Sequence, residues 1–296
     1  MVVRFGIAFL GLMFFGLSTS LSAVSSRTPR SLQLHSAAVV VQDEHTGELL
    51  LVKKANFAMP IASITKLMTA IVVLDRNLDM EETIAIEAVD KDTLRYSHSR
   101  LPVGTRLTRR QALLVTLMSS ENRAAHALGR TFPGGIAALV AAMNQKARVL
   151  GLQETRFVDP TGLSEGNVSS AQDLIFLVEA AGRYPQIRAF STQREGTISR
   201  GRRQLYFTNT NALIRNPGWH IDLSKTGYIS EGGRCLVMQT QLGRRSVLIV
   251  LLNSSGRYTH FADAIRIKQW VEASDSPRRE VGRPANTRML QAHHPY

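Results

Sequence analysis

The sequence predicts an α/β domain in which strands from both ends of the chain form one sheet, with helices between them. Two observations predict this architecture. Short β-like runs occur near the start, at residues 37–42 and 48–53, and again near the end, at residues 221–228, 235–242 and 246–252. Between them, apolar residues recur with helical spacing. The 296 residues, 44% of them hydrophobic, suffice for one large domain or two small ones with a sizeable core.

Each element has its own local signal. The first two strands flank residues 43–47, a polar segment that ends in glycine and predicts a hairpin. Apolar periodicity predicts helices over residues 62–76, 109–119, 135–150, 171–182 and 259–271. Gly151 suits the left-handed end of the third helix, and Ser170 suits the N-cap of the fourth. The last three strands are separated by glycine-containing turns, so an antiparallel sheet built from both chain ends is expected.

The N-terminal segment indicates export. Arg4 precedes an apolar run over residues 5–17, and small and polar residues follow at 18–23. This order is typical of a secretory signal peptide, and the run is shorter than the ~20 apolar residues of a membrane-spanning helix. We expect a signal peptide at residues 1–23, with an uncleaved N-terminal anchor as the alternative. A linker at 24–34, a folded domain at 35–271 and a flexible tail at 272–296 complete the predicted organisation.

Basic residues outnumber acidic ones. Lys and Arg total 36 against 23 Asp and Glu, a formal net charge of +13 that attracts polyanions. Because an exported protein rarely meets chromosomal nucleic acid, we expect an envelope polymer or lipid as the partner. Residues 188–245 hold ten basic against three acidic residues, which predicts an electropositive rim there. The tail has four arginines against three acidic residues, so at most peripheral membrane association is expected.

Neither a disulfide framework nor a metal centre is expected. The single cysteine, Cys235, lies in an apolar run and is expected to pack in the sheet. The eight histidines show no metal-ligand spacing. We therefore expect no metal and no cofactor.

A serine and a lysine stand one helical turn apart at the start of the first predicted helix. In Ser63-Ile64-Thr65-Lys66 this spacing places both side chains on one helix face. A serine hydroxyl is a poor nucleophile until a neighbouring base removes its proton, and a neutral lysine can be that base. The helix N-terminus adds free N–H groups that suit a developing oxyanion. The same residues also fit a capping serine followed by a solvated lysine.

Two further short motifs follow. Ser120-Glu121-Asn122 comes after a predicted helix, and Lys225-Thr226-Gly227 lies at the end of a predicted strand. Each alone is also compatible with a simple turn. In this order and in these contexts, the three motifs resemble the set found in penicillin-binding proteins and class A β-lactamases, where aspartate occupies the position of Glu121.

The chain resembles the low-molecular-mass penicillin-binding proteins, which are serine D-alanyl-D-alanine peptidases that act on peptidoglycan. The resemblance covers residues 35–271 and implies a β-lactamase/DD-peptidase-like fold with a helical insertion subdomain. Within the family, the sequence is most similar to the D-alanyl-D-alanine endopeptidase branch, penicillin-binding protein 7 type. Further matching segments are residues 60–62, 159–163, 167–174, 209–211 and 258–264.

The resemblance implies a role for each matched residue. Ser63 would be the acylated nucleophile, Lys66 its general base and Ser120 a proton relay toward the leaving amine. The backbone N–H groups of Ser63 and Tyr228 would form the oxyanion hole. The residues implied in substrate binding are Asn122, Lys225, Thr226, Gly227, Tyr228 and Arg257.

The second lysine has a physical rationale. A free lysine with a pKa of ~10.4 is neutral only ~0.04% of the time at pH 7, a handicap of about 4.6 kcal/mol. Burial and the positive charge of Lys225 are both expected to lower the pKa of Lys66 and to reduce that handicap.

Three other functions compete with the peptidase. Residues 162–166 match the G-x-S-x-G nucleophile elbow of α/β-hydrolases, but no hydrophobic strand runs directly into them. A class A β-lactamase also uses a glutamate for deacylation, and no E-x-x-L-N segment lies between Asn122 and Lys225. A non-catalytic envelope-binding protein would not need the intact serine and lysine residues.

The C-terminal part separates an endopeptidase from a carboxypeptidase. Carboxypeptidase relatives carry an extra β-domain and a membrane anchor, for which the 25 residues after Val271 are too few. They also place an arginine after the third strand, at a position that falls near His260 here, with Arg257 the nearest basic residue. We therefore expect a periplasmic endopeptidase that cleaves cross-linked peptidoglycan stem peptides and is covalently inhibited by β-lactams. A carboxypeptidase is the alternative, and no nucleic acid partner is expected.

Overall fold

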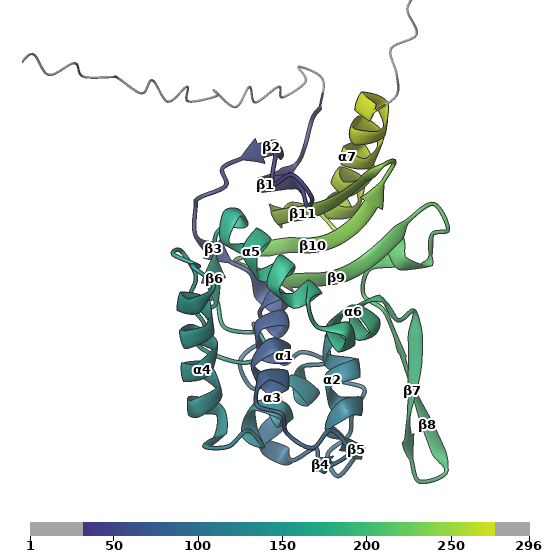
Figure 1. The fold of residues 1–296 in the computed structure, drawn as a ribbon. Coiled ribbons are helices and arrows are strands. Elements are labelled where there is room, and N and C mark those ends of the chain that lie inside the picture. The colour runs from purple at the N-terminus through teal and green to yellow at the C-terminus, as the bar shows by residue number, and fades with distance from the viewer. Residues whose placement is uncertain (1–31, 276–296) are drawn as a thin grey trace, which may run out of the picture.

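The computed structural model describes residues 32–275 (Figure 1). The expected signal peptide lies outside these residues, as do most of the linker and most of the tail. The strands are β1 Ser36–Asp43, β2 Leu49–Lys53, β3 Met59–Pro60, β4 Thr83–Ala85, β5 Arg106–Thr108, β6 Val168–Ser169, β7 Glu195–Arg200, β8 Arg203–Thr208, β9 His220–Ile229, β10 Gly233–Leu242 and β11 Arg245–Ser254. The α-helices are α1 Thr65–Asp75, α2 Arg109–Met118, α3 Asn122–Arg130, α4 Gly135–Val149, α5 Ala171–Gly182, α6 Pro185–Thr192 and α7 Thr259–Asp275. Three short 3-10 helices are η1 Ala62–Ile64, η2 Ala88–Asp90 and η3 Ala212–Arg215.

The main sheet joins both ends of the described chain, as the sequence predicts. Its five strands lie in the order β2-β1-β11-β10-β9, and all neighbours are antiparallel. The N-terminal strand β1 pairs with the C-terminal strand β11, with Val40 opposite Val250. The predicted hairpin between β1 and β2 is also present, and Gly47 closes it at a φ of 72°. The predicted fold class is confirmed.

Two hydrophobic cores lie on opposite faces of this sheet. Successive side chains of a strand point to opposite faces, so Val39 and Val41 pack with Ile267 of α7, whereas Ala38 and Val40 face the remaining helices. Helix α7 contacts β1, β10 and β11 from one side, and α5 contacts the same strands from the other (Figure 1). The sheet is therefore the middle layer between α7 and a helical lobe.

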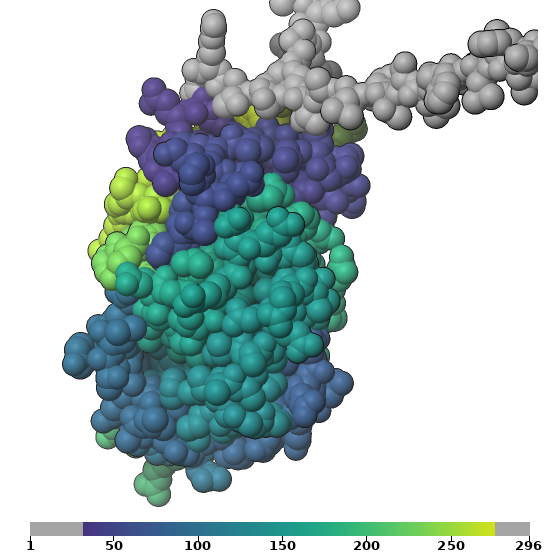
Figure 2. All heavy atoms as spheres, turned by 90° about the vertical axis from the view of Figure 1, so that its left-hand side faces the viewer, coloured from purple at the N-terminus to yellow at the C-terminus, as the bar shows by residue number. Residues whose placement is uncertain are grey.

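Helix α1 is the centre of the helical lobe. Its residues from Thr65 to Val73 are all buried, and it packs against α2, α3, α4 and α5. A helix buried on every side holds its start firmly, and η1, which directly precedes it, meets the sheet at β9. On the face seen in Figure 2, the teal residues of the α4–α5 region cover the centre, below the purple N-terminal strands.

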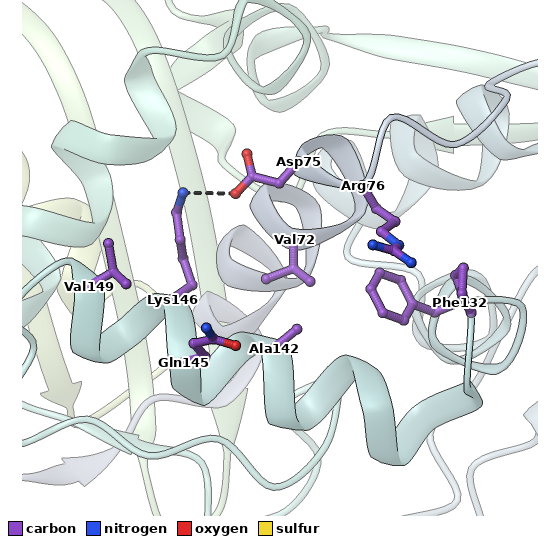
Figure 3. Close-up of a pocket in the computed structure, with 9 residues that line it drawn as sticks. Val72, Asp75, Arg76, Phe132, Ala142, Gln145, Lys146 and Val149 are labelled. Atoms are coloured by element: carbon purple, nitrogen blue, oxygen red, sulfur yellow. Dashed lines mark hydrogen bonds and ion pairs between the residues drawn. The ribbon is translucent and has the colours of Figure 1, made fainter.

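A cavity of about 420 Å³ lies between the C-terminal half of α1 and helix α4 (Figure 3). Val72, Phe132 and Ala142 line it together with an ion pair in which Lys146 donates to Asp75 across 2.8 Å. It opens at the end of α1 remote from Ser63, so it is separate from the three sequence motifs.

Several elements are absent from the sequence-based prediction. Helix α3 has only nine residues and its buried residues are mostly alanine, so it lacks the large apolar side chains that mark the longer helices. Helix α6 begins at Pro185, and the β7–β8 hairpin projects alongside the helical lobe (Figure 1). Helix α7 continues to Asp275, beyond the expected end at Val271.

Some of the basic residues of 188–245 lie in separate turns, so only part of this set can form the expected electropositive rim. Arg200 and Arg203 flank the exposed tip of the β7–β8 hairpin. At the β10–β11 turn, Arg245 is neutralised by Asp43 at 3.2 Å and Asp275 at 2.8 Å. A count along the sequence cannot reveal this dispersal, because it depends on how the hairpins point.

Candidate active site

Ser63 lies where the sheet meets the helical lobe. It belongs to η1, directly before α1, and its side chain is half-buried. The preceding residue, Ala62, has a φ of 49°, a left-handed conformation that is uncommon for a residue with a side chain. Such strain persists only where the surroundings enforce it, and it often accompanies functional sites.

Two glycines let other segments approach the backbone of this turn. A Cβ atom on Gly227 of β9 would lie 2.9 Å from the carbonyl oxygen of Ile61 and 3.0 Å from the nitrogen of Ser63. A Cβ on Gly162 would lie 1.9 Å from the carbonyl oxygen of Ala62. Real side chains do not tolerate such distances, so strand β9 and the loop around Gly162 enclose the serine only because both positions are glycine.

Lys66 lies under Ser63 and is completely buried. Its Nζ donates hydrogen bonds of 2.8 Å to the hydroxyl oxygen of Ser63 and 2.8 Å to Oδ1 of Asn122. A third, short hydrogen bond goes to the main-chain carbonyl of Thr161. The alternative of a capping serine followed by a solvated lysine is therefore wrong.

Burial is the main influence on the charge of Lys66. It lowers the pKa of Lys66 from 10.5 to about 7, although the carboxylates of Asp159, Glu121 and Asp92 oppose the change. A pKa of about 7 leaves a large neutral fraction near neutral pH, as a general base requires. Burial and then the charge of Lys66 also lower the pKa of Lys225 well below its usual value. Burial therefore lowers the pKa of Lys66, as expected. The repulsion between the two lysines was expected to lower the pKa of Lys66 as well, but it lowers the pKa of Lys225 instead.

The second motif lies in a tight connection between α2 and α3. Ser120 has a φ of 60°, and Glu121 caps α3 by accepting a hydrogen bond from the N–H of Arg123 at 3.2 Å. Asn122 then points inward, where its Nδ2 donates to the hydroxyl of Ser97 at 2.8 Å and its Oδ1 faces Lys66. The cap and the strained turn place Ser120 and Asn122 on the same side as Ser63.

The third motif comes from β9, which continues to Ile229 beyond the predicted end at residue 228. Lys225 is buried, and its Nζ donates to the hydroxyl of Ser120 at 2.9 Å and to the carbonyl of Thr226 at 2.8 Å. The hydroxyl of Thr226 donates to that of Thr210 at 2.6 Å. The site thus contains two serine–lysine pairs, one from α1 and one shared between the α2–α3 connection and β9.

The predicted residues surround one cavity of about 340 Å³. It is lined by Ser63, Ser120, Asn122, Thr226, Gly227, Tyr228 and Arg257, while Lys66 and Lys225 lie beneath it. The other lining residues, which carry no predicted role in substrate binding, are Thr210, Arg234, Tyr258, His260 and Phe261. All of the sequence-predicted site residues therefore lie in or directly against one site.

The loop over residues 159–167 completes the site, and in the sequence only residues 159–163 and 167 belong to segments that match the family. Oδ1 of Asp159 accepts from the N–H groups of Thr161 and Gly162, and its Oδ2 accepts from that of Ser164. Burial alone would raise the pKa of Asp159, but these hydrogen bonds together lower it. The fixed loop aims the carbonyl of Thr161 at Lys66. A main-chain carbonyl has no signature in a sequence, which is why this contact was not predicted.

The serine of the G-x-S-x-G match, Ser164, does not have the surroundings of a nucleophile elbow. Ser164 lies in this loop, and its hydroxyl accepts from the N–H of Gly166 at 3.1 Å. Neither a strand directly before it nor a helix directly after it is present, so the α/β-hydrolase interpretation is wrong.

Cys235 is completely buried in β10, and burial raises the pKa of its thiol to about 11. Both observations agree with the predicted packing role of this cysteine.

Within residues 32–275, no group of three or more His, Cys, Asp or Glu side chains is arranged to hold a metal ion. No helix in the same range is both long and apolar enough to cross a membrane.

A serine hydroxyl beside a lysine whose pKa is about 7, in a half-open cavity with a second serine–lysine pair, defines an acyl-transferring enzyme that uses a serine nucleophile. The comparisons with known proteins agree. Residues 23–256 match the peptidase family described as D-alanyl-D-alanine carboxypeptidase. The chain belongs to this family, and it is a serine D-Ala-D-Ala peptidase.

Two relatives are named D-alanyl-D-alanine endopeptidase. The protein from Pseudomonas aeruginosa is 45% identical over 267 residues, covering 88% of this chain and 86% of the relative. The protein from Escherichia coli is 39% identical over 273 residues, covering 92% and 88%. Among solved structures, the DD-transpeptidase of a Streptomyces strain is similar with a TM-score of 0.75 at 26% identity, covering 81% of this chain and 98% of that one. The family and the predicted fold are therefore both confirmed.

Proposed function

We propose that this protein is a D-alanyl-D-alanine endopeptidase that hydrolyses peptide cross-links of peptidoglycan through an acyl-enzyme on Ser63. The observation that carries the proposal is the 2.8 Å contact between the Lys66 amine and the Ser63 hydroxyl in a site of this fold. The relatives named endopeptidase, at 39% and 45% identity, favour cross-link cleavage over terminal trimming.

Acylation begins at Ser63 in this mechanism. Neutral Lys66 accepts the hydroxyl proton as Oγ attacks the carbonyl carbon of the D-alanine that is joined to the acceptor stem, and the N–H groups of Ser63 and Tyr228 stabilise the oxyanion. The C–N bond then breaks, and the leaving amine receives its proton through Ser120. The contacts of Lys66 with Ser63 and of Lys225 with Ser120 support these two proton transfers.

The remaining predicted residues bind substrate in this proposal. Asn122 holds the peptide backbone and orients Lys66 through Oδ1. Lys225 contributes positive potential, and Thr226 offers its hydroxyl to a carboxylate on the leaving side. Gly227 and Tyr228 present the edge of β9, and Arg257 adds a cation beside the exposed ring of Tyr258, 5.4 Å from its centroid.

Deacylation distinguishes the peptidase from a β-lactamase. Among the described residues, no carboxylate forms a hydrogen bond with Ser63 or Lys66. Asp159 is close enough to influence Lys66, but both of its oxygens are engaged by the loop. A water that hydrolyses the acyl-enzyme therefore has no carboxylate in contact with Ser63 or Lys66 to act as its base, and a penicilloyl adduct is expected to persist.

Two assays on the purified protein test this function. Parallel digestion of cross-linked muropeptide dimers and monomeric pentapeptides should show faster resolution of dimers than release of D-alanine. Faster trimming of monomers would instead make the protein a carboxypeptidase. Fluorescent penicillin should give a stable adduct, whereas rapid turnover of the label indicates a β-lactamase and no label indicates a non-catalytic binding protein.

A periplasmic location is part of the proposal. It rests on the predicted signal peptide at residues 1–23, ahead of a DD-peptidase domain predicted at 35–271 and a tail predicted at 272–296, of which residues 272–275 belong to α7. Attachment to the envelope would then be peripheral and electrostatic, so salt should release the protein from envelope fractions. A pool that needs detergent for release would favour the uncleaved anchor.

A further inference from the structure

One end of the active-site cavity carries positive charge without compensating acidic groups. Arg234 and Arg257 both line it, and none of its lining residues is Asp or Glu. Neither arginine takes part in any of the ion pairs found within residues 32–275. Two unpaired guanidinium groups beside a catalytic serine indicate a substrate with more than one negative charge there.

Arg234 is held in place by the geometry of β10. It lies opposite Tyr228 in the sheet, and its guanidinium carbon lies 4.4 Å from the centroid of the Tyr228 ring. The pairing with β11 shifts register between Arg234 and Leu236. A bulge of this kind re-aims a side chain, and here it accompanies an arginine that lines the cavity directly beyond Gly227.

His260 lies in the same part of the cavity. Its side chain is 4% exposed and stacks on Phe261 with ring centroids 3.9 Å apart. Its Nδ1 is buried and has no hydrogen-bond partner among the described residues. Burial and then the charge of Arg234 lower the pKa of His260 to about 4, against the influence of Asp263, so the ring is neutral at pH 7. The unsatisfied ring nitrogen is thus a further polar group without a protein partner beside Arg234.

We propose that Arg234, with His260 beside it, forms a second anion-binding subsite on the leaving-group side of the cavity. It binds a second carboxylate of the acceptor stem peptide, while Thr226 and Arg257 take the carboxylate next to the scissile bond. This inference rests on the proposed endopeptidase function. A terminal D-alanine leaves with one carboxylate, whereas the acceptor stem of a cross-link leaves with at least two. The subsite therefore provides a physical reason for cleaving cross-links in preference to ends.

A cycle of enzyme and substrate variants tests the subsite. The native protein and Arg234→Gln are compared on two cross-linked dimers, one with all acceptor carboxylates free and one with the second carboxylate amidated. Loss of a charge-assisted contact should reduce kcat/KM of the native protein about tenfold on amidation. Arg234→Gln should cleave the free dimer about tenfold more slowly than the native protein and should no longer distinguish the two dimers.

The control substitution is Arg244→Gln, which removes an arginine of the exposed β10–β11 turn and should leave both rates unchanged. β-Lactam acylation, which involves no acceptor stem, shows whether Arg234→Gln retains an intact nucleophile. An equal loss on both dimers, a matching loss of acylation, or equal cleavage of the two dimers by the native protein would overturn the subsite while leaving endopeptidase function intact. Cleavage of monomers but of neither dimer would overturn both proposals.

Discussion

The amine of Lys66 lies 2.8 Å from the hydroxyl oxygen of Ser63. In its charged form the amine donates this hydrogen bond, and in its neutral form it can accept the hydroxyl proton instead. Burial brings the pKa of Lys66 to about 7, so a small change in pH switches the amine between the two roles. The same contact therefore holds the serine in place and, when deprotonated, activates it.

The first prediction concerns the pH dependence of acylation. Since the neutral amine is the active form, the rate of acylation by a β-lactam should rise with pH through a midpoint of about 7. Lys66→Arg should be slower by about 10² to 10⁴, because a guanidinium does not act as a base at these pH values. Stopped-flow measurement between pH 5 and 9 checks both. Near-native acylation by Lys66→Arg would refute the general-base role.

A second prediction concerns the carboxylates around Lys66. Glu121 raises the pKa of Lys66, so Glu121→Gln should move the midpoint of the acylation profile to lower pH. Glutamine retains the side-chain oxygen that caps α3, which limits structural damage. Glu165→Gln, at an exposed carboxylate of the 159–167 loop, is the matched control and should leave the midpoint unchanged. A shift to higher pH in Glu121→Gln would contradict the electrostatic account.

The third prediction identifies the nucleophile. Mass spectrometry after treatment with penicillin should find one adduct, on the peptide that contains Ser63. Ser63→Ala should abolish it, whereas Ser164→Ala should not, because among the described contacts the Ser164 hydroxyl bonds the N–H of Gly166 and no basic side chain. An adduct on any other serine, or undiminished labelling of Ser63→Ala, would sink the assignment.

The sequence predicts the parts of the site that side-chain identity encodes. Ser63, Lys66 and Lys225 belong to motifs whose spacing is set by one helix turn or one strand, so their convergence follows once the fold is known. The hydrogen bond from Lys66 to the Thr161 carbonyl cannot be predicted from the sequence, because every residue has a carbonyl and only loop geometry aims this one at Lys66. The position of Arg234 in the cavity was not predicted either, because it follows the irregular pairing of β10 with β11. The alternation of side chains along a strand does not reveal such an irregularity.

The same distinction applies to the fold. The five strands of the main sheet and the long helices carry strong apolar patterns and were predicted. Helix α3 buries mainly alanine, and the β7–β8 hairpin is mostly exposed, so large buried apolar side chains are few in both. Tertiary packing decides both.

The last prediction tests how closely the 159–167 loop must approach the nucleophile. Gly162 has a φ of 79°, and a Cβ there would lie 1.9 Å from the carbonyl oxygen of Ala62. Gly162→Ala must therefore push the loop away from η1, which withdraws the Thr161 carbonyl from Lys66.

Gly104 is the matched control, because its φ is 84° but nothing lies within 4 Å of a Cβ at that position. Gly104→Ala should cost about 1 kcal/mol of unfolding free energy from backbone strain alone and should acylate normally. Gly162→Ala should cost at least about 3 kcal/mol and lose most of its β-lactam acylation. Urea unfolding and acylation rates measured on both variants decide the matter. If the two alanine variants behave alike, close approach of the loop is not what positions Lys66 against Ser63.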